Sequence, residues 1–175
     1  MISVIVPVFN EEEGIVGSLD ALEKALAGFN EYEIILVNDG SSDRSLEIIK
    51  SRKNNHISVI DHVENLGYGK SLFDGIFAAK HNCIAIIDGD GSYPADSIKE
   101  LYKYYPRYDM VVGARRGQEY VQGVFKRPAR LFFKYLAEYA TGRKVPDVNS
   151  GLRIFRKDVV IKFADSLCTG FSFTT

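Results

Sequence analysis

The sequence has 175 residues, of which 46% are hydrophobic and 26% charged, and its formal net charge is −1. A chain of this length and composition can bury the core of one soluble domain. The near-neutral charge excludes a general nucleic-acid binder, because phosphate backbones require a sustained basic surplus. The two cysteines, Cys83 and Cys168, make neither a disulfide framework nor a zinc spacing, which predicts a reducing compartment.

Strands and helices are predicted to alternate from the N-terminus onward. Residues 2–9 are a β-branched run typical of a buried strand, and a helical apolar period follows up to about Gly28. Asn10 and Glu13 have the spacing of a capping box, which would place them at the start of that helix. Residues 32–37 predict a second strand, which is followed by another helix.

A third strand is predicted at residues 57–60, before a helix that begins near a glycine-rich stretch. Gly69-Lys70-Ser71 contains the end of a phosphate-loop pattern, but Glu64 stands where that loop requires its first glycine. Leu72 replaces the third glycine of a dinucleotide-binding fingerprint. Neither of these two phosphate-binding motifs is therefore complete.

Residues 83–87 are a short apolar run between turn residues, which predicts a strand buried on both faces of a sheet. Asp88 and Asp90 follow it with one glycine between them, so their carboxylates can converge on one hard cation. An Asp-x-Asp triplet alone is weak evidence, because chance produces one in roughly every second chain of this size. Its place after a buried strand is stronger evidence, since open α/β sheets hold ligands there.

The remaining elements complete an α/β pattern. A helix from Pro94, a strand at residues 110–113, a short strand at residues 152–155 and a last helix are expected. This alternation predicts a mostly parallel sheet flanked by helices on both faces. Residues 121–140 mix aromatic and basic side chains in a helical pattern, which a helix packed on the core explains better than a membrane-seeking one.

Polar side chains follow three of the predicted strands, at residues 7–11, 39–42 and 88–90. The carboxyl ends of parallel strands share one edge of a sheet, where small ligands bind. Asp39 would accept hydrogen bonds from a base and ribose, and the two later aspartates would hold a metal that bridges phosphates. The pattern predicts a nucleotide diphosphate site. Three arginines could bind the phosphates as fixed cations: Arg115, Arg127 and Arg153. Taken singly, each is more commonly an exposed surface residue than a phosphate ligand.

Five motifs occur in a fixed order along the chain. They are Val6-Pro7-Val8-Phe9-Asn10-Glu11, Val37-Asn38-Asp39-Gly40-Ser41-Ser42-Asp43, Asn65-x-Gly67-x-Gly69, Asp88-Gly89-Asp90 and Asn149-Ser150-Gly151-Leu152-Arg153. Together they resemble a GT-A glycosyltransferase of family 2, and within it the dolichyl- or polyprenyl-phosphate sugar synthases of the mannose type. The resemblance implies inverting transfer of a sugar from a UDP- or GDP-linked donor to a polyprenyl phosphate, with Mg²⁺ or Mn²⁺, at the cytoplasmic face of a membrane.

The resemblance also implies roles for individual residues of this sequence. The residues expected to bind the nucleotide are Pro7, Phe9, Glu11, Val37, Asp39, Gly89 and Arg127. The metal would bind Asp88 and Asp90, and the residues expected to act in catalysis are Asp88, Asp90, Arg115 and Arg153. The sequence departs from the family at Asn38, where an aspartate is common, and at Phe9, where a tyrosine is common.

Three alternatives remain open. A family 2 enzyme acting on a saccharide hydroxyl would need a general base, which the resemblance places beyond the last residue, whereas a phosphate acceptor is already ionised. A sugar-1-phosphate nucleotidyltransferase has a similar sheet, but residues 7–11 lack its glycine-rich basic loop. A non-catalytic domain that binds nucleotide sugars would be favoured only if metal binding were absent, and the intact aspartate pair argues against it.

The C-terminal part of the sequence supports two further expectations. Basic side chains lie among aromatic ones between residues 125 and 143, which suits peripheral contact with an anionic membrane. No apolar run approaches the roughly 18 residues of a membrane span. Residues 170–175 are an aromatic stretch without a closing turn or charged tail. We therefore expect residues 1–175 to form a single GT-A catalytic domain that is truncated at its C-terminus.

Overall fold

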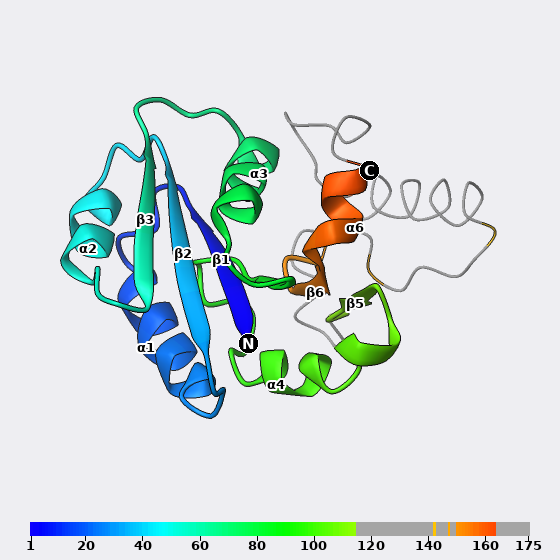
Figure 1. Cartoon of the computed structure of the whole chain (residues 1–175). Coiled ribbons are helices and arrows are strands. Elements are labelled where there is room, and N and C mark those ends of the chain that lie inside the picture. The colour runs from blue at the N-terminus through cyan, green and yellow to red at the C-terminus, as the bar shows by residue number, and fades with distance from the viewer. Residues whose placement is uncertain (115–141, 143–146, 148–149, 164–175) are drawn as a thin grey trace, which may run out of the picture.

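The computed structural model describes residues 1–114, 142, 147 and 150–163 (Figure 1). Within these residues, the strands are β1 (Ile2–Val8), β2 (Tyr32–Asp39), β3 (Ile57–His62), β4 (Cys83–Ile86), β5 (Met110–Val112) and β6 (Arg153–Arg156). The helices are α1 (Ile15–Leu26), α2 (Ser45–Ser51), α3 (Tyr68–Ala78), α4 (Ser97–Tyr102), the 3-10 helix η1 (Tyr105–Arg107) and α6 (Lys157–Lys162).

The strands form one sheet in the order β3-β2-β1-β4-β6-β5. Strands β3, β2, β1 and β4 run parallel, β6 runs antiparallel to β4, and β5 runs antiparallel to β6. The predicted mostly parallel α/β sheet is therefore confirmed. From β1 the chain adds β2 and β3 on one side of β1 and then adds β4 on the other side. Ligands of open α/β sheets bind where the strand order reverses in this way.

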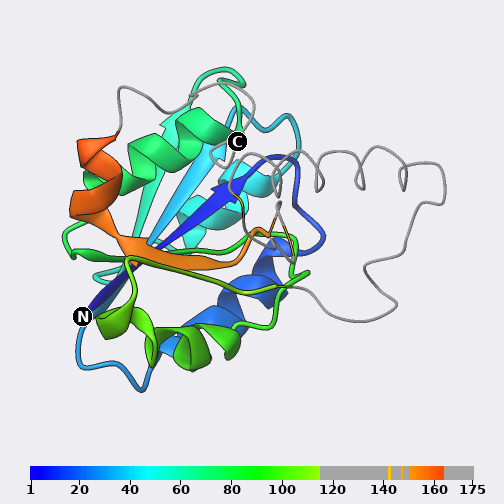
Figure 2. The ribbon, with the colours of Figure 1, turned by 90° about the vertical axis from the view of Figure 1, so that its right-hand side faces the viewer.

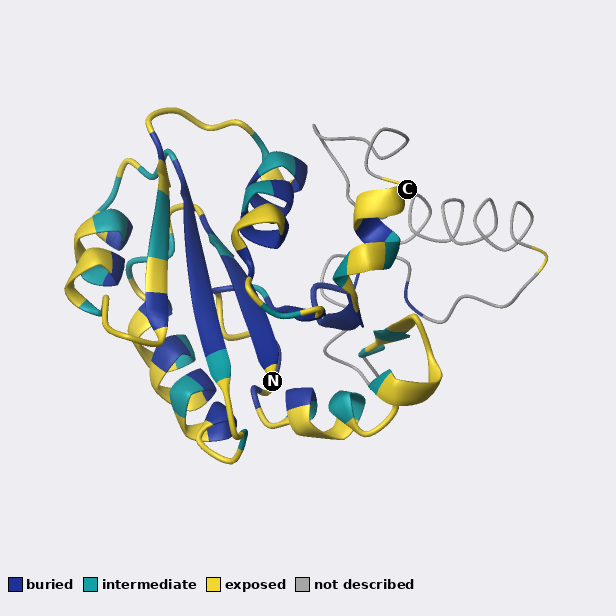
Figure 3. Ribbon diagram, viewed as in Figure 1, coloured by how far each residue is buried: buried dark blue, intermediate teal, exposed yellow. Residues whose placement is uncertain are grey.

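Helices cover both faces of the sheet, as Figure 2 shows by the positions of α3 and α6 on one side and α1 and α4 on the other. Alternate residues of β1 point to opposite faces, so Val4 and Val6 pack with α1 while Ile5 packs with α3. Helix α3 lies close to the sheet at Gly75, where a β-carbon would be 2.6 Å from Cγ2 of Ile5. Figure 3 shows the buried strands between these two layers.

The start of α1 differs from the capping box predicted for Asn10 and Glu13. The helix begins at Ile15 without a side-chain cap hydrogen bond. Asn10 instead adopts a positive φ of 55°, and its Oδ1 accepts the Ser42 amide hydrogen at 2.8 Å. Its own amide donates to Oγ of Ser41 at 3.1 Å. Asn10 thus ties the loop after β1 to the loop after β2, and these long-range hydrogen bonds take the place of a capping role.

Several predictions fall outside the described residues. These are the helix over residues 121–140, the environment of Cys168, and the aromatic stretch at residues 170–175. A single domain over residues 1–175 stays a prediction for the same reason. In the part of the chain that the structure describes, no helix is long and apolar enough to cross a membrane.

Candidate functional site

A cleft of about 350 Å³ opens where β1, β2 and β4 end and α3 begins. Its lining residues are Pro7, Val8, Phe9, Glu11, Asp39, Asn65, Tyr68, Ser71, Asp88, Gly89 and Asp90. Most of the residues predicted to bind nucleotide or metal are in this set, although they come from three separate motifs. The parallel strands bring them together because their carboxyl ends share one edge of the sheet.

The loop after β4 carries the predicted metal ligands into the cleft. Asp88 is half-buried, whereas Asp90 is exposed and its Oδ1 accepts the Ser92 amide hydrogen at 2.9 Å. Gly89 lies between them against the end of β1, where a β-carbon would be 3.2 Å from the backbone oxygen of Pro7. The glycine therefore lets this loop pass close to β1.

Asp88 is surrounded by groups from α3 and from the Ser-Gly segment before β6. The hydroxyl of Tyr68 donates to Oδ1 of Asp88 at 3.0 Å. Burial, followed by the negative charge of Asp88, raises the pKa of Tyr68, so its phenol stays a hydrogen-bond donor at neutral pH. Gly151 lies against the other side of the Asp88 carboxylate, and its amide donates to the hydroxyl of Tyr93 at 2.7 Å.

Arg153 lies beside this carboxylate because β6 runs antiparallel to β4. As the first residue of β6, it pairs with Ile86 near the end of β4. Its side chain is buried, and its Nε donates to the backbone oxygen of Ser150 at 2.9 Å. Burial lowers the pKa of the Arg153 guanidinium, and negative charge from Asp147 and Asp88 opposes that effect. A guanidinium remains charged at neutral pH, so Arg153 places a fixed cation next to the aspartate pair.

Negative charge accumulates on the opposite wall of the cleft. Partial burial raises the pKa of Glu11, and the charges of Asp90, Asp43 and Asp88 raise it further. Among the residues described, no group of three or more His, Cys, Asp or Glu side chains is arranged to hold a metal ion. A cation here would therefore bind the aspartates of the loop after β4 and take its other ligands from a bound molecule or water. Mg²⁺ is commonly bound in this way.

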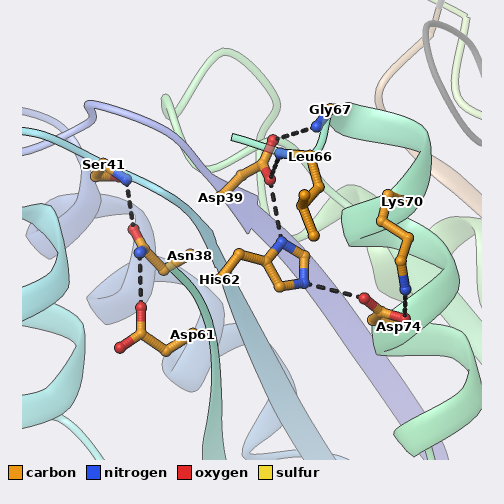
Figure 4. Close-up of polar contacts among 9 residues, drawn as sticks. All are labelled: Asn38, Asp39, Ser41, Asp61, His62, Leu66, Gly67, Lys70 and Asp74. Atoms are coloured by element: carbon orange, nitrogen blue, oxygen red, sulfur yellow. Dashed lines mark hydrogen bonds and ion pairs between the residues drawn. The ribbon is translucent and has the colours of Figure 1, made fainter. Parts of the chain in front are cut away.

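Asp39 lines the cleft but is held firmly by the protein (Figure 4). Its carboxylate accepts the amide hydrogens of Leu66 and Gly67 at 2.8 and 3.0 Å, and it lies 3.0 Å from Nδ1 of His62. Gly67 has a φ of 95°, which favours glycine and turns these amides toward the carboxylate. Asp39 therefore fixes the loop before α3 in addition to facing the cleft.

One predicted nucleotide-binding residue, Val37, lies outside this cleft, and two predicted arginines cannot be placed. Val37 is completely buried and packs in the core against α3, so the structure does not support a nucleotide contact by its side chain. Arg115 and Arg127 lie outside the described residues. Asn38, at the position where the family commonly has an acid, donates to Asp61 and accepts from the Ser41 amide, which stabilises the turn after β2.

Sequence reasoning assigned no role to four residues of the cleft wall, Val8, Asn65, Tyr68 and Ser71. Tyr68 stands between two glycines at the start of α3, and that position gave the only sequence signal for it. Ser71 lies one turn later and is completely buried, and its hydroxyl has no hydrogen-bond partner within the described residues. A buried hydroxyl in a cleft wall can be satisfied by a bound ligand or by water.

Comparison with known protein sequences identifies a family and a relative. The family model described as Glycosyl transferase family 2 matches residues 3–163. The undecaprenyl-phosphate 4-deoxy-4-formamido-L-arabinose transferase of Photorhabdus laumondii is 33% identical over 166 residues, covering 91% of this chain and 50% of that protein. The chain thus spans about half the length of this curated relative.

Two solved structures have a similar fold. A mannosyltransferase from Pyrobaculum calidifontis, in complex with GDP-Man and Mn²⁺, has a TM-score of 0.68 and 19% identity over 93% of this chain and 46% of its own. Glucosyl-3-phosphoglycerate synthase from Mycobacterium tuberculosis, in complex with Mn²⁺, UDP and glucosyl-3-phosphoglycerate, has a TM-score of 0.68 and 21% identity over 91% of this chain and 58% of its own. These similarities confirm the predicted GT-A fold.

Proposed function

Because the chain belongs to glycosyl transferase family 2, we propose that the protein containing it transfers a sugar, with inversion, from a nucleotide diphosphate donor to a polyprenyl phosphate. The observation that carries this proposal is the cleft at the ends of β1 and β4, where Asp88 and Asp90 line the same space as Phe9 and Asp39. Metal-binding carboxylates and a nucleoside-binding wall are thereby adjacent, as a nucleotide diphosphate requires.

The nucleoside part of the donor would occupy the wall formed by the ends of β1 and β2. Phe9 is 47% exposed and offers an aromatic face to the base. A carboxylate has about four acceptor sites, and three protein donors contact Asp39. Asp39 therefore keeps acceptor capacity for a base N–H or a ribose hydroxyl. Pro7 and Glu11 would complete this wall, and Gly89 lets the diphosphate come close to the loop after β4.

The residues present fit a divalent cation, Mg²⁺ or Mn²⁺. Asp90 is exposed to the cleft, Asp88 lies next to it, and the negative charges around Glu11 favour a cation. The two solved structures named above are complexes with Mn²⁺ and either GDP-Man or UDP. When bound here, the cation would neutralise charge that builds on the departing nucleotide diphosphate.

The side chains of this chain would stabilise the same leaving group and orient the donor. Arg153, buried beside Asp88, supplies a fixed positive charge, and Arg115 and Arg127 are proposed to add to it from residues that the structure does not describe. Tyr68 donates to Asp88 and so orients a carboxylate of the site. A phosphate acceptor needs no general base, because it is already ionised at neutral pH.

The acceptor is proposed from the similarity to an undecaprenyl-phosphate transferase, together with the basic aromatic stretch at residues 125–143. An acceptor of this kind has its chain in a bilayer, so the protein would act at the surface of a membrane. We propose the cytoplasmic face as its location.

A transfer assay tests the proposal. The full-length protein receives UDP- or GDP-linked radiolabelled sugar and Mn²⁺, with either polyprenyl phosphate or a free oligosaccharide as acceptor. The proposal predicts label in the lipid phase, and none with the Asp90→Asn variant. Label in the oligosaccharide alone would support the saccharide-hydroxyl alternative, and donor binding without any transfer would support a non-catalytic binding domain.

A further inference from the structure

His62 is a buried histidine whose two ring nitrogens both face carboxylates. It ends β3 and pairs in register with Asp39 at the end of β2. Its Nδ1 lies 3.0 Å from Oδ1 of Asp39, and its Nε2 lies 3.0 Å from Oδ2 of Asp74 on α3 (Figure 4). Only 7% of the His62 side chain is exposed, and His62 does not line the cleft itself.

A hydrogen bond from His62 to either carboxylate requires a proton on the ring nitrogen that faces it. An ionised carboxylate only accepts hydrogen bonds, and a neutral imidazole has one donor nitrogen and one acceptor nitrogen. The contact with Asp39 is a hydrogen bond when Nδ1 of His62 carries the proton. Lys70 binds the other oxygen of Asp74 (Figure 4), so the network runs from Asp39 at the cleft to the surface of α3.

This arrangement constrains the carboxylate of Asp39. Two of its donors, the amides of Leu66 and Gly67, belong to one loop, and His62 belongs to the neighbouring strand. Together they prevent rotation of the carboxylate and compensate the charge of a side chain that is only 6% exposed. Without the ring of His62, the loop amides alone would orient Asp39, and part of its charge would be uncompensated.

We propose that His62 is a positioning residue for the nucleotide, which acts by holding the Asp39 carboxylate in the orientation that accepts hydrogen bonds from the base or ribose. The inference rests on the proposed function, in which Asp39 contacts the nucleoside. His62 does not line the cleft, so its effect on a nucleotide there would pass through Asp39. Affinity for the nucleotide should therefore depend on His62, and affinity for inorganic diphosphate should not.

Calorimetric titration of the chain with UDP, GDP and inorganic diphosphate in the presence of Mn²⁺ tests this inference. We expect His62→Gln to raise the nucleotide dissociation constant roughly tenfold, within the range of couplings in one hydrogen-bond network, and to leave diphosphate binding unchanged. Asp74→Asn, a variant at the partly exposed end of the network, should raise the nucleotide dissociation constant by a smaller factor of about three. This variant replaces His62→Gln in the test if His62→Gln does not fold. His56→Gln, an exposed histidine just before the same strand, is the matched control and should bind as the unsubstituted chain does.

A double-mutant cycle separates positioning from a general structural effect. If His62 acts through Asp39, His62→Gln should change nucleotide affinity less than about twofold when Asp39 is already asparagine. A full tenfold effect in that background, an equal loss of diphosphate binding, or unchanged nucleotide binding in His62→Gln would each overturn the inference. If the unsubstituted chain bound neither nucleotide, the proposed function itself would be contradicted. A loss of nucleotide binding in the variants alone would leave the proposed function standing.

Discussion

The carboxylate of Asp88 lies against the α-carbon of Gly151. A β-carbon at residue 151 would be 1.8 Å from Oδ2 and 2.3 Å from Cγ of Asp88, and the three nearest atoms all belong to that one side chain. The Ser-Gly segment before β6 thus forms one wall of the position that Asp88 occupies. This contact gives a physical reason for glycine in the Ser-Gly-x-Arg motif.

Gly151→Ala should displace the Asp88 carboxylate and weaken its hydrogen bond to Tyr68. We expect nucleotide affinity in the presence of Mn²⁺ to fall by about tenfold, equivalent to roughly 1.4 kcal/mol. Calorimetric titration measures this loss. Gly28→Ala is the matched control, because a β-carbon there meets no atom within 4 Å. Equal affinities of the two variants would show that the position of Asp88 does not matter for binding.

Asp90→Asn should abolish the dependence of nucleotide binding on Mn²⁺, because it removes a charge from the cation site and keeps the shape of the side chain. Titration with and without EDTA measures the dependence. Asp96→Asn is the control, since Asp96 is an exposed acid paired with Lys99 a short distance along the chain. Metal-dependent binding that survives in Asp90→Asn would remove Asp90 from the cation site.

Asp39→Ala should reduce both nucleotide affinity and the free energy of unfolding. The substitution leaves the amides of Leu66 and Gly67 without their acceptor, a loss of about 1–3 kcal/mol in stability. Urea denaturation measures the free energy of unfolding, and titration with nucleotide and inorganic diphosphate measures binding. Asp20→Ala breaks a surface ion pair with Arg52 and should cost less than about 1 kcal/mol. Equal loss of nucleotide and diphosphate binding would place Asp39 away from the nucleoside.

The raised pKa of Glu11 predicts a pH effect on stability. Burial and the neighbouring charges of Asp90, Asp43 and Asp88 disfavour its ionised form in the folded state. Between the ordinary Glu value of 4.5 and the raised value, the folded chain binds more protons than the unfolded chain. The contribution of Glu11 to stability is therefore present below pH 4.5 and is lost as the pH rises through the raised pKa.

Glu11→Gln should consequently stabilise the metal-free chain at neutral pH, and the gain should vanish below about pH 4.5. Urea unfolding at a series of pH values measures the difference between the variant and the unsubstituted chain. Glu13→Gln, at an exposed position two residues away, is the control and should show no such trend. A destabilised Glu11→Gln at neutral pH would contradict the electrostatic account of this wall.

Much of the fold follows from local sequence signals. The β-branched runs that became β1 and β2, and the apolar period of Ile15, Leu19 and Leu22, are dictated by burial and could be predicted directly. The shared edge also follows, because the carboxyl ends of parallel strands lie at one edge of the sheet. The aspartates after β4 were predictable for the same reason.

The parts that could not be predicted depend on contacts between distant segments. Asn10 has the sequence pattern of a helix cap, but it bonds to Ser41 and Ser42 because the two loops meet only in the folded chain. His62 carries no motif, and its importance follows from its pairing with Asp39 across two strands. Val37 was predicted at the site from its motif, yet it lies two residues before Asp39 on the same face of β2, where it is buried in the core with residues of α3.

Binding of UDP and GDP to the unsubstituted chain, measured by calorimetry at constant ionic strength with Mn²⁺ or with EDTA, tests the central claim most directly. The account predicts that at least one nucleotide binds in the presence of Mn²⁺ and that its affinity falls tenfold or more in EDTA, about 1.4 kcal/mol. Equal affinity in EDTA, or no binding of either nucleotide, would contradict a metal-dependent nucleotide site at the ends of β1 and β4.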